Sequence, residues 1–231
     1  MNANYVIDWL KNFKQKNNVK GVVLGLSGGK DSTVVAMLSK KVWGDNVVAV
    51  LMPNGVQKDI SDSLDIAKTL GLNYKIINIG NIYNEIVNLT EPTEKSKTNI
   101  PPRVRMTVLY AIAQNLGYLV IGTGNLSESF IGWTTKFGDS ACDFNPIGNC
   151  TCSEVIEIGK ELAEVYGLPL KYIEKTPADG LTGKSDEDNF GFTYKEVDEY
   201  IRNRKVGPNI DKIVAMNKSS HHKRHMPKCA Q

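Results

Sequence analysis

Short apolar runs and longer amphipathic segments alternate along the first half of the chain. The apolar runs, rich in Val, Ile and Leu, are typical of buried strands; they are Val19–Leu26, Val47–Met52, Tyr74–Ile79 and Tyr118–Gly122. Between them, apolar residues at helical spacing predict helices over Lys30–Val42, Asp59–Leu70, Ile82–Leu89 and Arg103–Leu116. This alternation predicts an α/β fold, with a parallel sheet, helices on both faces and right-handed crossovers.

The remaining segments add further helices and several polar stretches. Helical spacing predicts a leading helix over Asn2–Phe13 and later helices over Glu154–Tyr166, Tyr194–Arg204 and Asn209–Met216. Polar stretches with few apolar residues are predicted to be binding, lid or mobile loops; they are Thr90–Asn99, Asn125–Asn149 and Pro177–Asn189. No internal repeat or clear boundary interrupts the pattern, so we expect a single domain over residues 1–231.

The composition argues against several classes of protein. The 231 residues include 28 Lys plus Arg and 25 Asp plus Glu, and the net charge of +3 favours neither a nucleic acid nor a membrane as partner. No apolar run approaches the roughly 18 to 20 residues that span a bilayer. The first residues do not resemble a signal peptide, and the 4 cysteines do not make a disulfide scaffold. We therefore expect a cytoplasmic protein with reduced thiols.

The positions of the histidines restrict the mechanism. All 3 histidines lie close to the C-terminus, as His221, His222 and His225. A Ser-His-Asp triad within the folded body and an HExxH zinc site are therefore excluded. The chemistry must rely on carboxylates, Lys, Arg, backbone amides or a metal ion.

The strongest local signal is the segment Gly25–Ser32, GLSGGKDS, which follows the first predicted strand and opens a helix. Adjacent glycines allow a tight turn, and the start of the helix presents N–H groups and a positive dipole end to an anion. Ser27, Ser32 and Lys30 add donors, and Asp31 is a candidate magnesium ligand. The segment matches neither the Walker A pattern nor the GxGxxG dinucleotide pattern, but it predicts a phosphate-binding loop.

The string SGGKDS resembles the pyrophosphate-binding loop of the N-type ATP pyrophosphatases, the PP-loop family. Members of that family cleave ATP between its α and β phosphates, and the loop holds the departing pyrophosphate. The resemblance implies a Rossmann-like sheet of the adenine nucleotide alpha hydrolase type. This loop alone leaves open NAD synthetase, the synthetase domain for GMP, asparagine synthetase and tRNA-modifying enzymes.

Motifs further along the chain narrow the resemblance to the ammonia-dependent NAD synthetases. They occur in the family's order and with similar spacing, and they cover nearly the whole chain. The motifs are RVRM at Arg103–Met106, GTGNLSE at Gly122–Glu128, KFGD at Lys136–Asp139 with Asp143 and Pro146, GFTY at Gly191–Tyr194 with Asp198 and Tyr200, and HKR at His222–Arg224.

The resemblance implies roles for individual residues. Asp31, Lys30 and Ser27 would act in catalysis, and Asp31 and Glu128 would hold Mg²⁺. The implied ATP-binding positions are Gly25, Leu26, Ser27, Gly28, Gly29, Lys30, Asp31, Ser32, Thr123, Cys152 and Ala178. The implied binding residues for deamido-NAD, at the interface of a homodimer, are Arg103, Lys136, Asp143, His222 and Lys223.

The implied reaction suits the residues available. Attack of the nicotinate carboxylate on the α-phosphate of ATP gives an acyl-adenylate and pyrophosphate, and ammonia then displaces AMP to give NAD. The first step brings two anions together, so it needs charge neutralisation and alignment rather than a histidine base. The chain leaves no room for a glutaminase domain, so we expect free ammonia or a glutaminase acting in trans.

Two positions depart from the family pattern. Cys152 stands where the family has a lysine that reaches ATP, and Ala178 stands where a Ser or Thr is usual. Lys160 or Lys184 are candidates to replace the charge. These departures motivate an alternative, a nucleotide-binding relative without turnover. A second alternative is another PP-loop enzyme that adenylates a different carboxylate or a tRNA base.

The cysteines allow a further hypothesis, because some PP-loop relatives use thiols to modify tRNA. Cys142, Cys150 and Cys152 form a single C-x-C with one outlier, which is a poor match to a zinc site. His221, His225 and Cys229 have ligand-like spacing, but Pro227 interrupts a helix there. We therefore expect no structural metal at either place.

Overall fold

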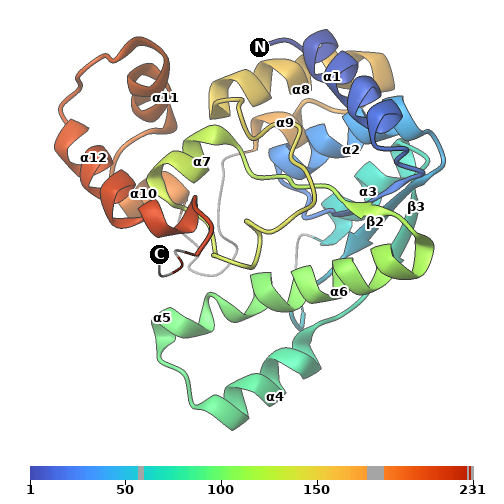
Figure 1. Cartoon of the computed structure of the whole chain (residues 1–231), viewed down its shortest axis with the longest axis horizontal. Helices are drawn as coiled ribbons and strands as arrows, with labels where there is room; N and C mark the ends of the chain where they lie inside the picture. Colours follow the sequence, from blue (N-terminus) through green and yellow to red (C-terminus); the bar gives the residue numbers. More distant parts are fainter. Residues whose placement is uncertain (57–59, 176–184, 228, 230–231) are drawn as a thin grey trace.

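The computed structural model describes residues 1–56, 60–175, 185–227 and 229. Within this part of the chain, four parallel strands form one sheet in the order β3-β2-β1-β4 (Figure 1). Their bounds are β1 Val22–Gly25, β2 Val47–Leu51, β3 Asn73–Ile76 and β4 Leu119–Val120. β1 lies in the middle, with Val23 paired to Val48 of β2 on one side and to Val120 of β4 on the other.

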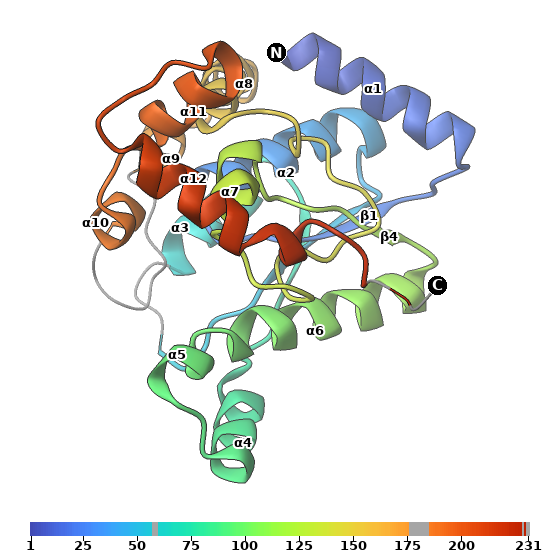
Figure 2. The ribbon, with the colours of Figure 1, turned by 60° about the vertical axis from the view of Figure 1, so that its left-hand side comes forward.

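Helices cover both faces of the sheet because the buried strand residues alternate between two cores. Val22 and Leu24 pack into a core with α1 (Ala3–Lys16), α2 (Lys30–Trp43), α3 (Ile60–Thr69) and α8 (Cys152–Tyr166). Val23 packs on the opposite face against α6 (Ile100–Leu116). Figures 1 and 2 show α6 on the side of the sheet away from α1 and α2, with α4 (Gly80–Thr90) and α5 (Glu94–Lys97) extending from it. The predicted α/β class is confirmed.

The C-terminal helices form a small third core beside α7 (Leu126–Ile131). They are α10 (Asp186–Phe190), α11 (Tyr194–Asn203), α12 (Ile210–Ser219) and the 3₁₀ helix η1 (His221–Lys223), while α9 (Lys171–Glu174) packs against α2 and α8. Phe190, Phe192 and Ile213 pack with Ile131 of α7 and Cys152 of α8. This core places α11 next to the first turns of α7 and α8, and it places the end of the chain next to the C-terminal end of α7.

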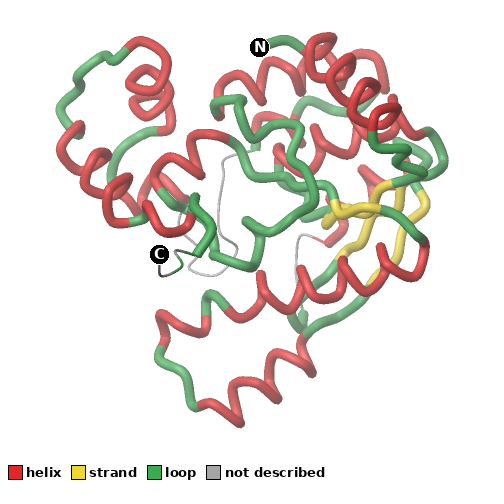
Figure 3. The backbone as a smooth tube through the Cα atoms, in the orientation of Figure 1, coloured by secondary structure: helices red, strands yellow, loops and turns green. Residues whose placement is uncertain are grey.

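Several predicted boundaries and loops were wrong. β3 is exposed at all four residues, although a buried strand was predicted, because it forms the edge of the sheet. The predicted loop Asn125–Asn149 contains α7, whose first turn is closed by a capping box between Asn125 and Glu128. The stretch Thr90–Asn99 contains α5, whose N-terminus is capped by Thr93. The connection between α7 and α8 is an irregular loop, as predicted (Figure 3).

None of the helices in the described ranges combines the length and the apolar character that crossing a membrane requires.

The N-terminus of α8 is tied to two distant parts of the chain through Glu154. Glu154 forms a capping box with Thr151. Its carboxylate accepts a hydrogen bond from Arg202 Nη2 of α11 at 2.6 Å and forms an ion pair with the amino group of Met1 at 3.1 Å. Partial burial would raise the pKa of Glu154, but hydrogen bonds from Arg202 and the Thr151 N–H lower it to about 2. The ionised carboxylate therefore joins α8 to α11 and to the start of α1.

We expect Glu154→Gln to lower the free energy of unfolding by about 1 kcal/mol at neutral pH, a value that allows for solvent screening of this partly exposed group. The carboxyl pKa is 4.5 before folding and about 2 afterwards, so the stabilisation is complete above pH 4.5 and is lost as the pH falls toward 2. Urea unfolding at several pH values measures the difference. Glu157→Gln on the exposed side of α8 is the control, and an equal effect of both variants at all pH values would contradict the assignment.

Candidate functional site

The loop between β1 and α2 is held in a tight turn by its own hydroxyl groups. Gly28 has a φ of +81°, a backbone conformation that favours glycine. The Ser27 N–H donates to Ser32 Oγ at 3.2 Å, and the hydroxyls of Ser32 and Thr33 donate to the Gly29 carbonyl at 3.0 and 2.8 Å. The loop therefore leads directly into the N-terminus of α2, as expected for an anion-binding turn.

A cavity of about 160 Å³ lies in front of this turn. The residues that line it come from the loop, from the end of β4, from α7 and from the α7–α8 connection; they are Ser27, Gly29, Asp31, Ser32, Thr123, Gly124, Glu128 and Asp139. Six of the predicted site residues thus meet around one space at the carboxyl end of the sheet, where open α/β sheets bind ligands. A larger open hollow beside α1, of about 400 Å³, includes none of them and is lined by residues such as Lys11 and Lys14.

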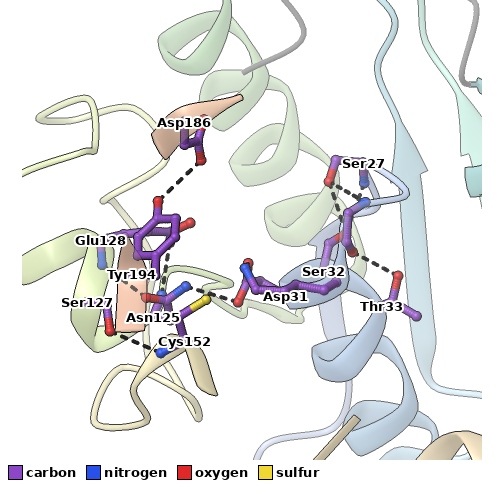
Figure 4. A network of polar contacts seen from close by, with 12 residues as sticks. Ser27, Asp31, Ser32, Thr33, Asn125, Ser127, Glu128, Cys152, Asp186 and Tyr194 are labelled. Atoms are coloured by element: carbon purple, nitrogen blue, oxygen red, sulfur yellow. Dashed lines mark hydrogen bonds and ion pairs between the residues drawn. The ribbon is translucent and has the colours of Figure 1, made fainter. Parts of the chain in front are cut away.

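A network of acid, amide and ammonium groups connects α2 to α7 at this cavity (Figure 4). Asp31 accepts from Lys30 Nζ at 2.7 Å and from Asn125 Nδ2 at 3.1 Å. The N–H of Asn125 donates in turn to Glu128 Oε2 at 3.1 Å. Lys30 and Asn125 are almost completely buried, with exposures of 3% and 0%. The two candidate metal ligands, Asp31 and Glu128, are therefore linked through one residue, Asn125, whose side chain donates to Asp31 and whose backbone N–H donates to Glu128.

Burial and neighbouring charges shift the pKa values of Lys30, Glu128 and Cys152. Burial alone would lower the pKa of Lys30, but the charges of Asp31 and Glu128 raise it above its ordinary value. Burial and the neighbouring Asp31 raise the pKa of Glu128 well above its usual range, although Lys30 acts in the opposite direction. Burial raises the pKa of the Cys152 thiol to about 12, despite the nearby Lys30. The raised pKa favours the neutral thiol of Cys152 at neutral pH.

The donor atoms suit a hard cation that is shared with a substrate. Asp31 and Glu128 offer carboxylate oxygens to the same cavity, and oxygen ligands are those that Mg²⁺ prefers. Among the described residues, no group of three His, Cys, Asp or Glu side chains is arranged to hold a metal. A cation at this place would therefore complete its coordination with water and substrate oxygens.

A second group of predicted residues forms a cationic region beside the α7–α8 connection. Arg103 Nε donates to the Lys136 carbonyl at 3.3 Å, and Lys223 Nζ donates to the carbonyls of Gly132 and Thr134 at 2.7 and 2.6 Å. Burial and the charge of Arg103 are among the causes that lower the pKa of Lys223. Arg103 and Lys223 are therefore neighbours, and both contact the backbone of the segment that carries Lys136.

Other predicted residues are placed differently. Asp143 lies in the α7–α8 connection, where it accepts from the Val120 N–H of β4 at 2.7 Å and from the Tyr110 hydroxyl of α6 at 3.3 Å. His222 is exposed on η1. Leu26 points into the core, and its N–H donates to the Val50 carbonyl of β2. Asp143 and Leu26 therefore contact other parts of the protein and do not line the cavity. Ala178 and Lys184 lie outside the described residues.

The structure places Lys30 of α2 beside Cys152 of α8. Lys160, a candidate to replace the lysine absent at position 152, instead pairs with Glu157 and Glu174 at 3.3 and 3.7 Å on the outer side of α8. Burial raises the pKa of the Cys152 thiol, and the charge of Lys30 acts in the opposite direction without outweighing it. The charge next to position 152 therefore comes from the loop lysine.

In the described ranges, neither the cysteines nor the histidines belong to a group of three or more side chains that could hold a metal ion. Cys142 is partly buried against Gly122, whereas Cys150 is buried at the other side of the loop, near Met1. The rings of His221 and His225 stack with their centroids 3.9 Å apart. These groups do not converge on one point.

Sequence reasoning gave no role to Asn125, Ser127 or Asp198, which hold the site together. The carboxylate of Asp198 accepts a very short hydrogen bond from the Ser127 hydroxyl, and it accepts from the N–H and hydroxyl of Ser153 at 2.8 and 2.6 Å. It thereby joins α11 to the first turns of α7 and α8. The N-x-x-E spacing of Asn125 and Glu128, typical of a capping box, could have indicated the start of α7.

We expect Asp198→Asn to lower the free energy of unfolding by about 2 kcal/mol, because a buried acceptor of three hydrogen bonds loses its charge and one acceptor atom. Urea unfolding gives the change in stability, and hydrogen exchange of the α7 amides should become faster. Glu199→Gln, which removes the surface pair with Lys205 at 2.6 Å, is the control. Unchanged exchange in α7 would show that Asp198 does not order this helix.

Comparisons with known proteins agree with this geometry. A family model described as NAD synthase matches residues 2–227. The chain is 40% identical to the NH₃-dependent NAD⁺ synthetase of Finegoldia magna, over 95% of this chain and 91% of the relative. It is 41% identical to the enzyme of that name from Carboxydothermus hydrogenoformans, over 96% and 93%.

Solved structures share the fold over almost the full length. An NMN synthetase from Francisella tularensis superposes with a TM-score of 0.91 at 34% identity, covering 99% of this chain and 96% of the other. An NH₃-dependent NAD synthetase from Campylobacter jejuni superposes with a TM-score of 0.81 at 32% identity, covering 99% and 97%. The prediction of an ammonia-dependent NAD synthetase, a ligase that uses ATP to amidate deamido-NAD, is confirmed at the level of the family: this chain belongs to the NAD synthase family.

Proposed function

We propose that this chain amidates deamido-NAD with ammonia at the cavity between α2 and α7, with ATP and Mg²⁺, as a homodimer in the cytoplasm. The observation that carries the proposal is the meeting of the SGGKDS loop with Glu128 and Thr123 around one cavity. An anion-binding turn that faces two carboxylates is suited to a nucleotide whose phosphates are shared with a cation.

The loop supplies the groups that hold ATP phosphates. Ser27, Gly29 and Ser32 of the turn line the cavity at the N-terminus of α2, where the helix dipole is positive. Asp31 and Glu128 would hold Mg²⁺, which when bound neutralises phosphate charge. Thr123, just beyond β4, faces the same cavity and contacts the nucleotide in this proposal.

The cationic region provides for the second substrate. Arg103 and Lys223 are neighbours and contact the segment that carries Lys136, so these charges can hold the phosphates or carboxylate of deamido-NAD close to the α-phosphate of ATP. His222 and Asp143 complete the predicted contacts at the homodimer interface. Alignment of two anions in this way favours attack of the carboxylate on the α-phosphate, which gives the acyl-adenylate and pyrophosphate.

The second step needs no protein nucleophile. Ammonia attacks the acyl carbon, AMP leaves, and the product is the amide of NAD. The neutral Cys152 thiol agrees with this scheme, because no thiolate is required. Free ammonia is the proposed nitrogen donor, and a glutaminase acting in trans is the alternative source.

A second candidate substrate is the deamido mononucleotide. The observation that favours it is the TM-score of 0.91 to the NMN synthetase from Francisella tularensis, compared with 0.81 to the NAD synthetase from Campylobacter jejuni at similar identity. The same loop and carboxylates would serve both reactions, because the reacting carboxylate and ATP are common to them. The relatives at 40% and 41% identity favour the dinucleotide.

We expect purified protein with MgATP, deamido-NAD and ammonium to form NAD and pyrophosphate in equal amounts. Both products are measured by chromatography. A parallel reaction with the deamido mononucleotide in place of deamido-NAD shows which of the two is the substrate. Pyrophosphate without NAD would indicate that ammonia must come from a partner. Bound nucleotide without either product would favour the non-catalytic alternative.

Asp31→Ala is expected to abolish Mg²⁺-dependent pyrophosphate release, a loss of about 10² or more, because a metal ligand and its charge are removed. Circular dichroism checks that the fold is retained. Asp62→Ala, a nearby carboxylate on α3 that pairs with Lys175 at 2.8 Å, is the control. Unchanged release in Asp31→Ala would show that Asp31 is not a metal ligand.

A further inference from the structure

The ammonium of Lys30 pairs with the Asp31 carboxylate and does not line the cavity. Its nitrogen lies 2.7 Å from Asp31 Oδ2, its residue is 3% exposed, and it is not among the residues that line the cavity. A lysine that served only to contact phosphate would have its charged end at the surface of that space. Lys30 instead neutralises the carboxylate next to it.

The groups around Lys30 stabilise one buried positive charge. The ring centroid of Tyr194 lies 5.7 Å from the ammonium, a distance that suits a cation–π contact. The Glu128 carboxylate and the neutral Cys152 thiol lie close enough to affect Lys30 electrostatically. A buried ammonium is stable only with such partners, and two neighbouring, partly buried carboxylates without a cation would repel each other.

We propose that Lys30 is a built-in counter-ion for Asp31 and Glu128, which keeps the two carboxylates assembled in the absence of a metal and opposes the binding of a free divalent cation. This inference rests on the proposed function, in which these two residues hold Mg²⁺.

The consequence is that the divalent cation binds together with ATP and not before it. A divalent cation that approaches Asp31 alone meets the positive charge of Lys30 beside the same oxygens, which disfavours binding. ATP brings several negative charges into the cavity, and its phosphate oxygens complete the coordination. The cation therefore enters together with the nucleotide, and the site is not occupied unproductively when ATP is absent.

Binding of Mn²⁺ as a probe tests the inference without turnover. Electron paramagnetic resonance of unbound Mn²⁺ is followed with wild type, Lys30→Met and Lys160→Met, with and without α,β-methylene ATP. Lys30→Met should bind free Mn²⁺ about tenfold or more tightly than wild type, and the difference should shrink when the analogue is present. Lys160→Met, which removes a lysine from a surface pair on α8, should behave as wild type.

Thermal unfolding gives a second readout. Lys30→Met should have a lower Tm than wild type in EDTA and should recover with excess Mg²⁺, whereas the Tm of wild type should change little. Lys30→Arg, which keeps the charge, should resemble wild type in both measurements. Equal Mn²⁺ affinity in wild type and Lys30→Met would overturn the inference, as would a Tm deficit that Mg²⁺ does not reduce.

If Lys30→Met does not fold, the inference is tested by nuclear magnetic resonance of the wild-type protein labelled with ¹⁵N-lysine. The Lys30 ammonium signal, identified by its absence in Lys30→Arg, should shift when Mg²⁺ is added with the ATP analogue but not with Mg²⁺ alone. No shift with both would overturn the inference. Failure of the proposed function would be distinct, because wild type would then bind no Mn²⁺ even with the analogue.

Discussion

The parallel pairing of β1 with β4 is the constraint on which the candidate site depends. The two strands are separated by most of the first half of the chain, yet their pairing places the loop before α2 next to the segment before α7. The hydrogen bond between Asp31 and Asn125, 94 residues apart, exists only because of this pairing. Parallel strands deliver their carboxyl ends to the same edge of a sheet, so the starts of the following helices meet there.

Charge at this edge is balanced within the protein before any ligand arrives. Lys30 pairs with Asp31, and Asn125 connects Asp31 to Glu128. Because buried charges are costly unless they are paired, such a network fixes the side chains in one arrangement. Preorganised charges of this kind are the main means by which an enzyme aligns two anions and stabilises the transition state between them.

The C-terminal helices stabilise the site through hydrogen bonds to α7 and α8. Asp198 of α11 accepts hydrogen bonds from residues in the first turns of α7 and α8. At the other end of α7, Arg224 donates to the carbonyls of Ser129 and Phe130 at 2.9 and 3.1 Å, so a cation lies at the negative end of the helix dipole. The basic tail therefore has a structural role in addition to its place in the cationic region. Both ends of α7 are held by residues 71 and 95 positions later in the chain than the residues they contact.

The sequence by itself determined the fold class, the phosphate loop and the family, because these depend on local patterns. Hydrophobic runs at strand and helix spacing, and glycines with serines between a strand and a helix, have the same meaning wherever they occur. The resemblance also indicated most residues around the cavity, including Asp31, Thr123 and Glu128.

Only the tertiary structure decided which side chains contact each other. It placed Lys30 beside Cys152 and against Asp31, and it placed Lys160 on the outside of α8. It also showed that β3 is an exposed edge and that Leu26 belongs to the core. These outcomes depend on strand order and on helix packing between distant segments, and no local pattern of residues carries that information.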